Sequence, residues 1–332
     1  MKRLLIAALV LALGASFLVV PAVSADSDDV LWGVTGINFG TDNEYSEVFK
    51  VDTSTGVVTM VNDDPSNPLY SDIAVTPDGK VYAVGRTSTN HNFTDFFRLT
   101  STTGEVMVIE PDAFTDAGFY HVNGLSAESN TSLLAIEGGG VCTGWGSPTG
   151  PRLLRINLDG AGDLASITNL GAIAGCPQYG CCSDGDLDKD PDTGKWYAGF
   201  YGDAGSDMME LNLADPGSST YKSQSDIKWQ GGLAFSSDGT AYAGCWATEI
   251  LYTVNIAGGG SAVAHDLSSD LSGNIFGLSK DKEPEEQPPV GGSSLPTDKA
   301  ALMLPWVLGA GALLMLAGAF FVWNRKRDRA QV

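Results

Sequence analysis

One stretch of the chain decides the fold: Ala74-Val75-Thr76-Pro77-Asp78-Gly79-Lys80-Val81-Tyr82-Ala83-Val84. Its apolar ends have the length of short β-strands. The residues between them are those of a tight turn, in which glycine supplies a positive φ angle. The same pattern returns over residues 234–244, which read Ala-Phe-Ser-Ser-Asp-Gly-Thr-Ala-Tyr-Ala-Gly. A strand, a turn and a second strand therefore form a unit that repeats.

Outward from this stretch, the unit occurs five times and contains four strands. The turn precedes an apolar second strand, which begins at Leu31, Val81, Leu133, Trp196 and Ala241. An alternating third strand follows it, beginning at Val48, Phe96, Leu153, Met208 and Leu251. A fourth strand begins near Val57, Glu105, Leu164, Ser219 and Ala262. Units of about 50 residues with four strands each are typical of β-propeller blades.

The phase of the repeat predicts how the ring closes. The exported chain begins on a second strand and ends on a first strand, Leu278-Ser279-Lys280. That last strand completes a blade only if it pairs with the strand at Leu31, and such pairing removes two exposed edges. The sequence thus predicts an all-β protein with a five-bladed β-propeller closed by a C-terminal inner strand.

The two quoted stretches resemble the repeats of secreted NHL-like and YVTN-like β-propellers. The resemblance covers residues 29–282 and implies a secreted or cell-surface propeller. Those families usually have six or seven blades, so the count of five departs from them. A propeller fold does not by itself indicate an activity.

Both ends of the chain are predicted to be targeting segments. Residues 1–25 read as a signal peptide, with Lys2-Arg3, an apolar run and small residues up to Ala25. Residues 300–323 are apolar and uncharged, and the basic tail at 324–332 follows them. This pattern predicts a single-pass membrane protein at the cell surface, with its C-terminus in the cytoplasm.

Between propeller and anchor, residues 283–299 are rich in Pro, Gly and Ser and read as a stalk. The propeller domain is expected to span residues 26–282. Leu295-Pro296-Thr297-Asp298 is similar to a sortase signal, but Asp298 and Lys299 replace the Thr-Gly bond that sortases cleave. A retained membrane anchor is the preferred interpretation.

The charge of the chain excludes one class of partner. The formal net charge is −21, and six of the 19 basic residues lie in the signal peptide and the tail. The exported part is therefore even more acidic, and such a surface repels nucleic acid. Solubility is the simpler explanation of this acidity, and cation binding is the alternative.

Loop lengths predict where binding takes place. Connections between first and second strands, and between third and fourth strands, are short turns. The other two kinds of connection are long in most units and lie together on the opposite face, here called the long-loop face. Clustering of insertions on one face indicates a recognition surface. Its candidate aromatic ligand residues are Tyr70, Phe93, Tyr120, Trp145, Tyr179, Trp229 and Trp246.

All five cysteines map to the same face, and export favours disulfides. Cys142 is expected to pair with Cys176 or Cys181, and Cys182 with Cys245, which leaves one thiol unpaired. The connectivity stays open, as does a zinc or copper site.

The fourth unit carries an unusual run of alternating carboxylates, Asp184, Asp186, Asp188 and Asp190. These groups could converge on a structural calcium ion, the one cofactor that the sequence raises. Asp188 takes a position held elsewhere by alanine or serine, so its burial requires a partner such as Lys189, a metal or water.

Two functions follow from these patterns. The preferred one is a membrane-tethered module for binding or adhesion, which uses the long-loop face on an extracellular protein or glycan. The alternative is a hydrolase acting on carbohydrates or lactones, with Asp72 and Asp186 as axial carboxylates and His121 as a possible helper.

Overall fold

The computed structural model describes residues 29–36, 45–87, 94–138, 151–174, 185–200 and 205–281. All of them belong to the first of the two compact units into which the chain divides, Met1–Glu285. The predicted signal peptide, stalk, membrane helix and tail lie outside the described residues. Within the described residues, no helix has the length and apolar character needed to cross a membrane.

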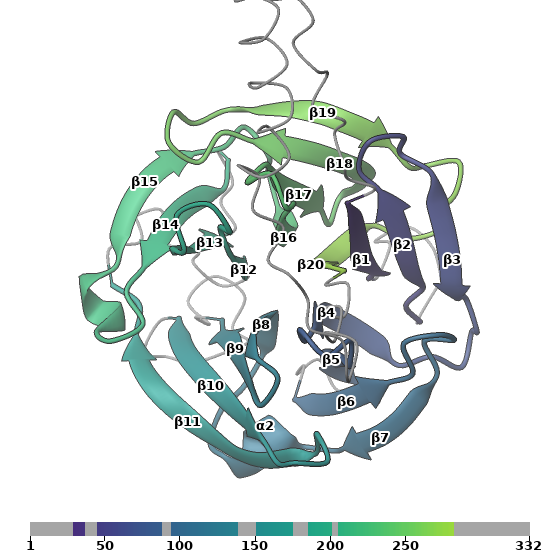
Figure 1. Ribbon diagram of the computed structural model, residues 1–332, viewed down its shortest axis with the longest axis vertical. Coiled ribbons are helices and arrows are strands. Elements are labelled where there is room, and N and C mark those ends of the chain that lie inside the picture. The colour runs from purple at the N-terminus through teal and green to yellow at the C-terminus, as the bar shows by residue number, and fades with distance from the viewer. Residues whose placement is uncertain are drawn as a thin grey trace, which may run out of the picture. The chain divides into compact units, whose positions relative to one another are not determined.

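The described strands form a five-bladed β-propeller, as the repeat predicts (Figure 1). The five blades are here called A, B, C, E and F, in their order around the ring, and the letter D is not used. Four blades each consist of four consecutive antiparallel strands. Blade B contains β4 (Leu69–Val75), β5 (Val81–Arg86), β6 (Asp95–Leu99) and β7 (Val106–Glu110); blade C contains β8 (Val122–Ser129), β9 (Ser132–Glu137), β10 (Arg152–Leu158) and β11 (Leu164–Ala172). Blade E contains β12 (Gly185–Lys189), β13 (Trp196–Phe200), β14 (Asp207–Leu211) and β15 (Thr220–Gln224); blade F contains β16 (Gln230–Phe235), β17 (Ala241–Cys245), β18 (Thr248–Val254) and β19 (Ser261–Asp266).

The remaining blade, blade A, closes the ring with strands from both ends of the described chain. Its order is β20-β1-β2-β3, from β20 (Ile275–Lys280), β1 (Val30–Thr35), β2 (Val48–Asp52) and β3 (Val58–Asn62). The C-terminal strand β20 pairs antiparallel with β1, and Leu278 lies opposite Gly33. An ion pair of 2.8 Å between Lys50 Nζ and Asp281 Oδ2 reinforces the seam. The predicted closure is confirmed.

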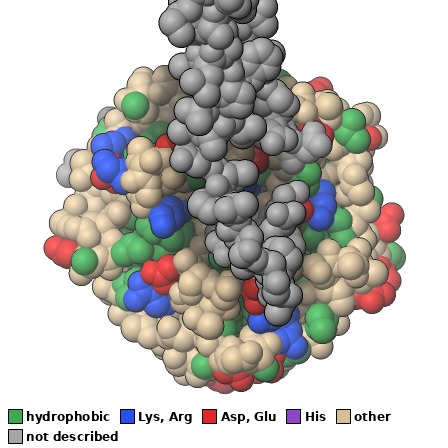
Figure 2. Space-filling view, in the orientation of Figure 1, with side chains coloured by type: hydrophobic (Ala, Val, Ile, Leu, Met, Phe, Trp, Pro, Cys, Tyr) green, Lys and Arg blue, Asp and Glu red, His purple; other side chains and the backbone are tan. Residues whose placement is uncertain are grey.

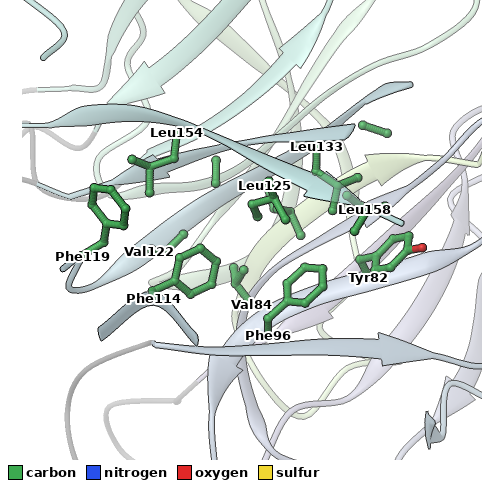
Figure 3. Close-up of a cluster of buried hydrophobic side chains, with 14 residues drawn as sticks. Tyr82, Val84, Phe96, Phe114, Phe119, Val122, Leu125, Leu133, Leu154 and Leu158 are labelled. Carbon is green, nitrogen blue, oxygen red and sulfur yellow. The ribbon is translucent and has the colours of Figure 1, made fainter. Parts of the chain in front are cut away.

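The hydrophobic core lies between the blades rather than at the centre of the ring. Each of five buried clusters joins one blade to the next. The cluster between blades B and C is typical: Tyr82 and Phe96 stack at 5.6 Å, and Leu125 and Leu158 face them from blade C (Figure 3). Alternating strands produce this arrangement because successive side chains point to opposite faces of a sheet.

Phe114 and Phe119 complete that cluster from the connection between blades B and C. The connection contains α2 (Ala113–Asp116), and the β14–β15 connection contains the 3-10 turn η1 (Pro216–Ser218). Neither was predicted, since four or three residues are too few for a helical period to show in the sequence.

Turns on the short-turn face overlap neighbouring blades. Tyr82 of blade B donates a hydrogen bond of 3.0 Å to the carbonyl of Gly162 in a turn of blade C. His265 of blade F contacts the carbonyl of Thr53 in a turn of blade A at 2.7 Å.

On the face seen in Figure 2, basic side chains lie beside acidic ones. Arg155 and Glu128 of blade C form an ion pair at 2.6 Å.

Candidate functional site

Five inner strands surround the axis of the propeller: β4, β8, β12, β16 and β20 (Figure 1). At one level each contributes an equivalent residue, and these five residues are called the axial ring: Asp72, Gly124, Asp186, Gly232 and Gly277. The axial ring therefore consists of two aspartates and three glycines. A Cβ on Gly277 would overlap Asp72 Oδ1, and one on Gly124 would lie 2.6 Å from the carbonyl oxygen of Gly185. The glycines are required because the strands approach so closely.

The structure brings the predicted acidic pair together. Asp72 and Asp186 are hydrogen-bonded to each other through their side chains, and both are fully buried. Burial and the neighbouring Asp186 raise the pKa of Asp72 well above its ordinary value. Burial also raises the pKa of Asp186, with Asp188 adding to the effect.

Each of these carboxylates also bridges two strands. Asp72 accepts the backbone N–H of Ile73 at 2.7 Å and, from the next blade, that of Leu125 at 2.5 Å. Asp186 accepts the N–H of Leu187 at 2.6 Å and, again from the next blade, that of Leu233 at 2.5 Å. All four oxygens therefore accept backbone N–H groups, which satisfies part of the cost of burying the carboxyl groups.

A second pair of contacts lies one level further along the axis and explains Asp188. Its Oδ1 accepts the hydroxyl of Ser126 at 2.8 Å, and its Oδ2 accepts the N–H of Phe235 at 2.8 Å. Asp188 therefore joins β12 to inner strands on both sides. The partner that its burial required is a hydroxyl and a backbone amide.

The predicted calcium ligands do not converge within the described residues. Asp190 lies in the β12–β13 turn, where it accepts the N–H of Asp192 at 2.9 Å and the hydroxyl of Thr193 at 2.6 Å. Asp186 and Asp188 point to neighbouring inner strands instead, and Asp184 lies outside the described residues. No group of three His, Cys, Asp or Glu side chains in the described part of the chain has the arrangement of a metal site.

His121 does not lie within the axial ring. It immediately precedes β8 and has a φ of 59°. Its carbonyl accepts the N–H of Gly138 at 2.9 Å, so the residue fixes the course of the backbone where blade C begins.

In the described part of the long-loop face, two exposed aromatic side chains lie at similar places, just before an inner strand. Trp229 is 39% exposed and immediately precedes β16; Tyr120 is 43% exposed and lies one residue further from β8. Trp229 and His121, the residues at which the connections enter β16 and β8, have φ angles of 60° and 59°. A positive φ at a bulky residue is strained and persists only where the surrounding structure enforces it.

Trp229 belongs to an aromatic cluster that connects blades F and A, here called the tryptophan cluster. Trp229 and Trp246 form an edge-to-face pair at 6.4 Å, and Trp246 forms another with Phe276 at 5.5 Å. The N–H of Trp246 donates to the carbonyl of Trp229 at 3.0 Å, and Asn274 Nδ2 donates to the carbonyl of Trp246 at 2.6 Å. The sequence marked both tryptophans as ligand residues but missed Phe276, because it lies within a strand.

Near Tyr120, a buried ion pair fixes the base of the longest connection. Arg152 binds Glu137 through two nitrogens, the Nη2–Oε1 distance being 2.7 Å, and the N–H of Tyr120 donates to Glu137 Oε1 at 2.8 Å. The Glu137 side chain is fully buried. These residues stand opposite each other where β9 and β10 end, so they hold both ends of the 138–151 connection.

One predicted ligand residue is corrected. Tyr70 is fully buried between blades A and B, where it packs edge-to-face on Phe97 at 5.3 Å. It belongs to the core because it lies inside β4 rather than in the preceding connection. Phe93, Trp145 and Tyr179 lie outside the described residues.

The cysteine prediction is corrected at one position. Cys245 is a free, buried thiol that donates to the carbonyl of Lys228 at 3.2 Å, so the expected bridge to Cys182 is absent. Cys245 is the last residue of β17 and packs with the core between blades E and F. Cys142, Cys176, Cys181 and Cys182 lie outside the described residues.

No family model matches the chain, and no curated protein is similar to it in sequence. Solved β-propellers are similar to it at low identity. A gluconolactonase from Xanthomonas campestris is 12% identical with a TM-score of 0.44, over 75% of this chain and 80% of that one. A putative 6-phosphogluconolactonase from Bacteroides fragilis is 12% identical with a TM-score of 0.41, over 77% of this chain and 99% of that one.

TolB from Acinetobacter baumannii is 16% identical with a TM-score of 0.41, over 71% of this chain. The matched part spans about half of TolB, 53% of its length. These similarities concern the arrangement of strands and carry no information about what this chain binds or catalyses.

Proposed function

We propose that this protein is a membrane-tethered extracellular binding module whose long-loop face contacts a glycan or a protein. The observation that carries the proposal is the pair of exposed aromatics, Tyr120 and Trp229, where strained backbone enters inner strands β8 and β16. Aromatic side chains held on a rigid scaffold contribute large contact areas at little entropic cost, as binding sites require.

The surrounding contacts support the same proposal. Trp246 and Phe276 support Trp229 from one side, and the Glu137–Arg152 pair holds the backbone beneath Tyr120. Both groups are therefore held in place before any ligand arrives. A preformed surface loses less entropy on binding than a flexible one.

A binding screen tests the proposal. The propeller, residues 26–282, is applied to arrays of glycans and of cell-surface proteins, and hits are measured again with Trp229→Ala and Tyr120→Ala. We expect at least tenfold weaker binding for one of these variants. The matched control is Tyr221→Ala, because Tyr221 is equally exposed, at 41%, but lies on outer strand β15. Binding that the control alone weakens would contradict the proposal.

A second candidate function is hydrolysis of a carbohydrate or lactone. The observation in its favour is the direct hydrogen bond between Asp72 and Asp186, whose raised pKa values are typical of an acid–base pair. Against it, both carboxyl groups are fully buried and occupied by backbone N–H groups. Assays on glycosides and sugar lactones with Asp186→Asn as the control decide the matter: turnover that the variant lacks supports an enzyme, and no turnover eliminates it.

A further inference from the structure

The most unusual feature that the binding function leaves unexplained is the meeting of two carboxyl groups on the axis. Asp72 and Asp186 come from blades B and E, which are not adjacent in the ring. Gly124 of blade C lies between them and has no side chain to keep them apart. Two negative charges in contact in a buried site repel strongly, so they cannot both remain ionised at little cost.

Within the described part of the chain, no basic side chain compensates this pair. On the inner strands packed around it, the titratable side chains that interact with Asp72 and Asp186 are each other and Asp188, which is also acidic. The axial ring otherwise consists of glycines from β8, β16 and β20. Among the described residues, the four oxygens accept the backbone N–H groups of Ile73, Leu125, Leu187 and Leu233, and the two side chains otherwise contact each other.

We propose that Asp72 and Asp186 hold one proton between them and that this proton joins four of the five inner strands, so that its loss at alkaline pH loosens the ring. With one proton, the pair carries a single charge, and the two carboxyl groups attract each other through a hydrogen bond. Each also holds the N–H of the next blade, so the proton links blades B, C, E and F. Without the proton, both groups are anionic and repel each other.

The sign of the pH effect follows from linkage. An unfolded chain releases both protons near pH 4, whereas the folded pair keeps one to higher pH. The folded state therefore binds more protons than the unfolded state above pH 4, and the folding equilibrium constant falls by up to about tenfold per pH unit until the folded pair ionises. This loss is opposite in direction to the acid denaturation that most carboxylates produce.

The experiment measures urea unfolding of the propeller, residues 26–282, between pH 5 and pH 9. The wild type is expected to lose stability steadily across this range. The double variant Asp72→Gly/Asp186→Gly places at blades B and E the residue that blades C, F and A carry, and it should be less stable at pH 5 but nearly independent of pH. Asp207→Asn is the control, because Asp207 is the other described carboxyl whose pKa burial raises, and its removal should leave most of the slope.

Infrared spectroscopy gives a second measurement that needs no variant to fold. The wild type labelled with 13C-aspartate should show a protonated carboxyl band at pH 7 that disappears at alkaline pH. A flat stability profile, or the absence of this band, would overturn the proposal. This proposal and the binding function can fail separately. A flat pH profile of stability would leave the binding measured on the arrays unaffected, and replacement of Trp229 should leave the pH profile of stability unchanged.

Discussion

The hydroxyl of Ser126 on β8 donates to Asp188 on β12, and this hydrogen bond of 2.8 Å joins blades C and E beside the axis. Asp188 also accepts the N–H of Phe235 from blade F. One acidic side chain therefore connects three consecutive blades. It replaces the alanine or serine found at the equivalent position of the other inner strands.

The first prediction concerns this contact. Ser126→Ala should destabilise the propeller by about 2 kcal/mol, because one oxygen of a buried carboxylate then lacks its donor. Chemical unfolding at pH 7 measures the effect. In the Asp188→Ala background the same serine substitution should cost much less, and equal costs in both backgrounds would show that the two residues are not coupled.

The second prediction concerns the base of the 138–151 connection. Arg152→Ala should destabilise the protein by about 3–5 kcal/mol, since Glu137 would remain buried without its cation. Arg152→Ala combined with Glu137→Gln should recover a large part of that loss. The control is Arg155→Ala, whose partner Glu128 is partly exposed and whose ion pair is worth about 1 kcal/mol or less. Similar losses for Arg152 and Arg155 would contradict this account.

The third prediction concerns acid pH. The hydroxyl of Ser236, followed by the N–H of Thr240, lowers the pKa of Asp238 in the β16–β17 turn. A lowered pKa in the folded state contributes stability above the unfolded pKa, and this contribution disappears as the pH falls below about 4. Asp238→Ala should therefore cost about 0.5 kcal/mol at pH 7, a value reduced by solvent screening, and almost nothing at pH 3. Thermal unfolding at the two pH values measures the difference.

The repeat allowed the fold to be predicted because the strands and turns of each blade are encoded in a short, nearly contiguous stretch of sequence. Glycine turns such as Asp78-Gly79 and the phase of Leu278 were sufficient for the blade number and the closing strand. The site was less predictable, since contacts at the axis depend on which residues face each other across the ring. Asp72 and Asp186 were marked as a pair, but their fixation by N–H groups of Leu125 and Leu233 is set by tertiary packing alone.

Aromatic residues show the same limit. Tyr70 and Trp229 both lie near the start of an inner strand, and sequence alone assigned them the same role. The structure buries Tyr70 inside β4 and leaves Trp229 exposed at 39%. The difference arises where β4 and β16 begin: Tyr70 is the second residue of β4, whereas Trp229 precedes β16.

The fourth prediction separates the backbone strain at Trp229 from the side chain that occupies it. Trp229→Ala and Trp229→Gly both remove the indole and its contact with Trp246, so both should lose ligand binding. They differ in the backbone, because glycine adopts a φ of 60° without the steric cost that alanine pays. The glycine variant should therefore be more stable than the alanine variant by about 1 kcal/mol, which urea unfolding can resolve. At Tyr221, inside strand β15, the order should reverse, since glycine weakens a strand interior. An alanine variant of Trp229 as stable as the glycine variant would show that the strain is released once the indole is gone, and that the tryptophan cluster itself holds the backbone in this conformation.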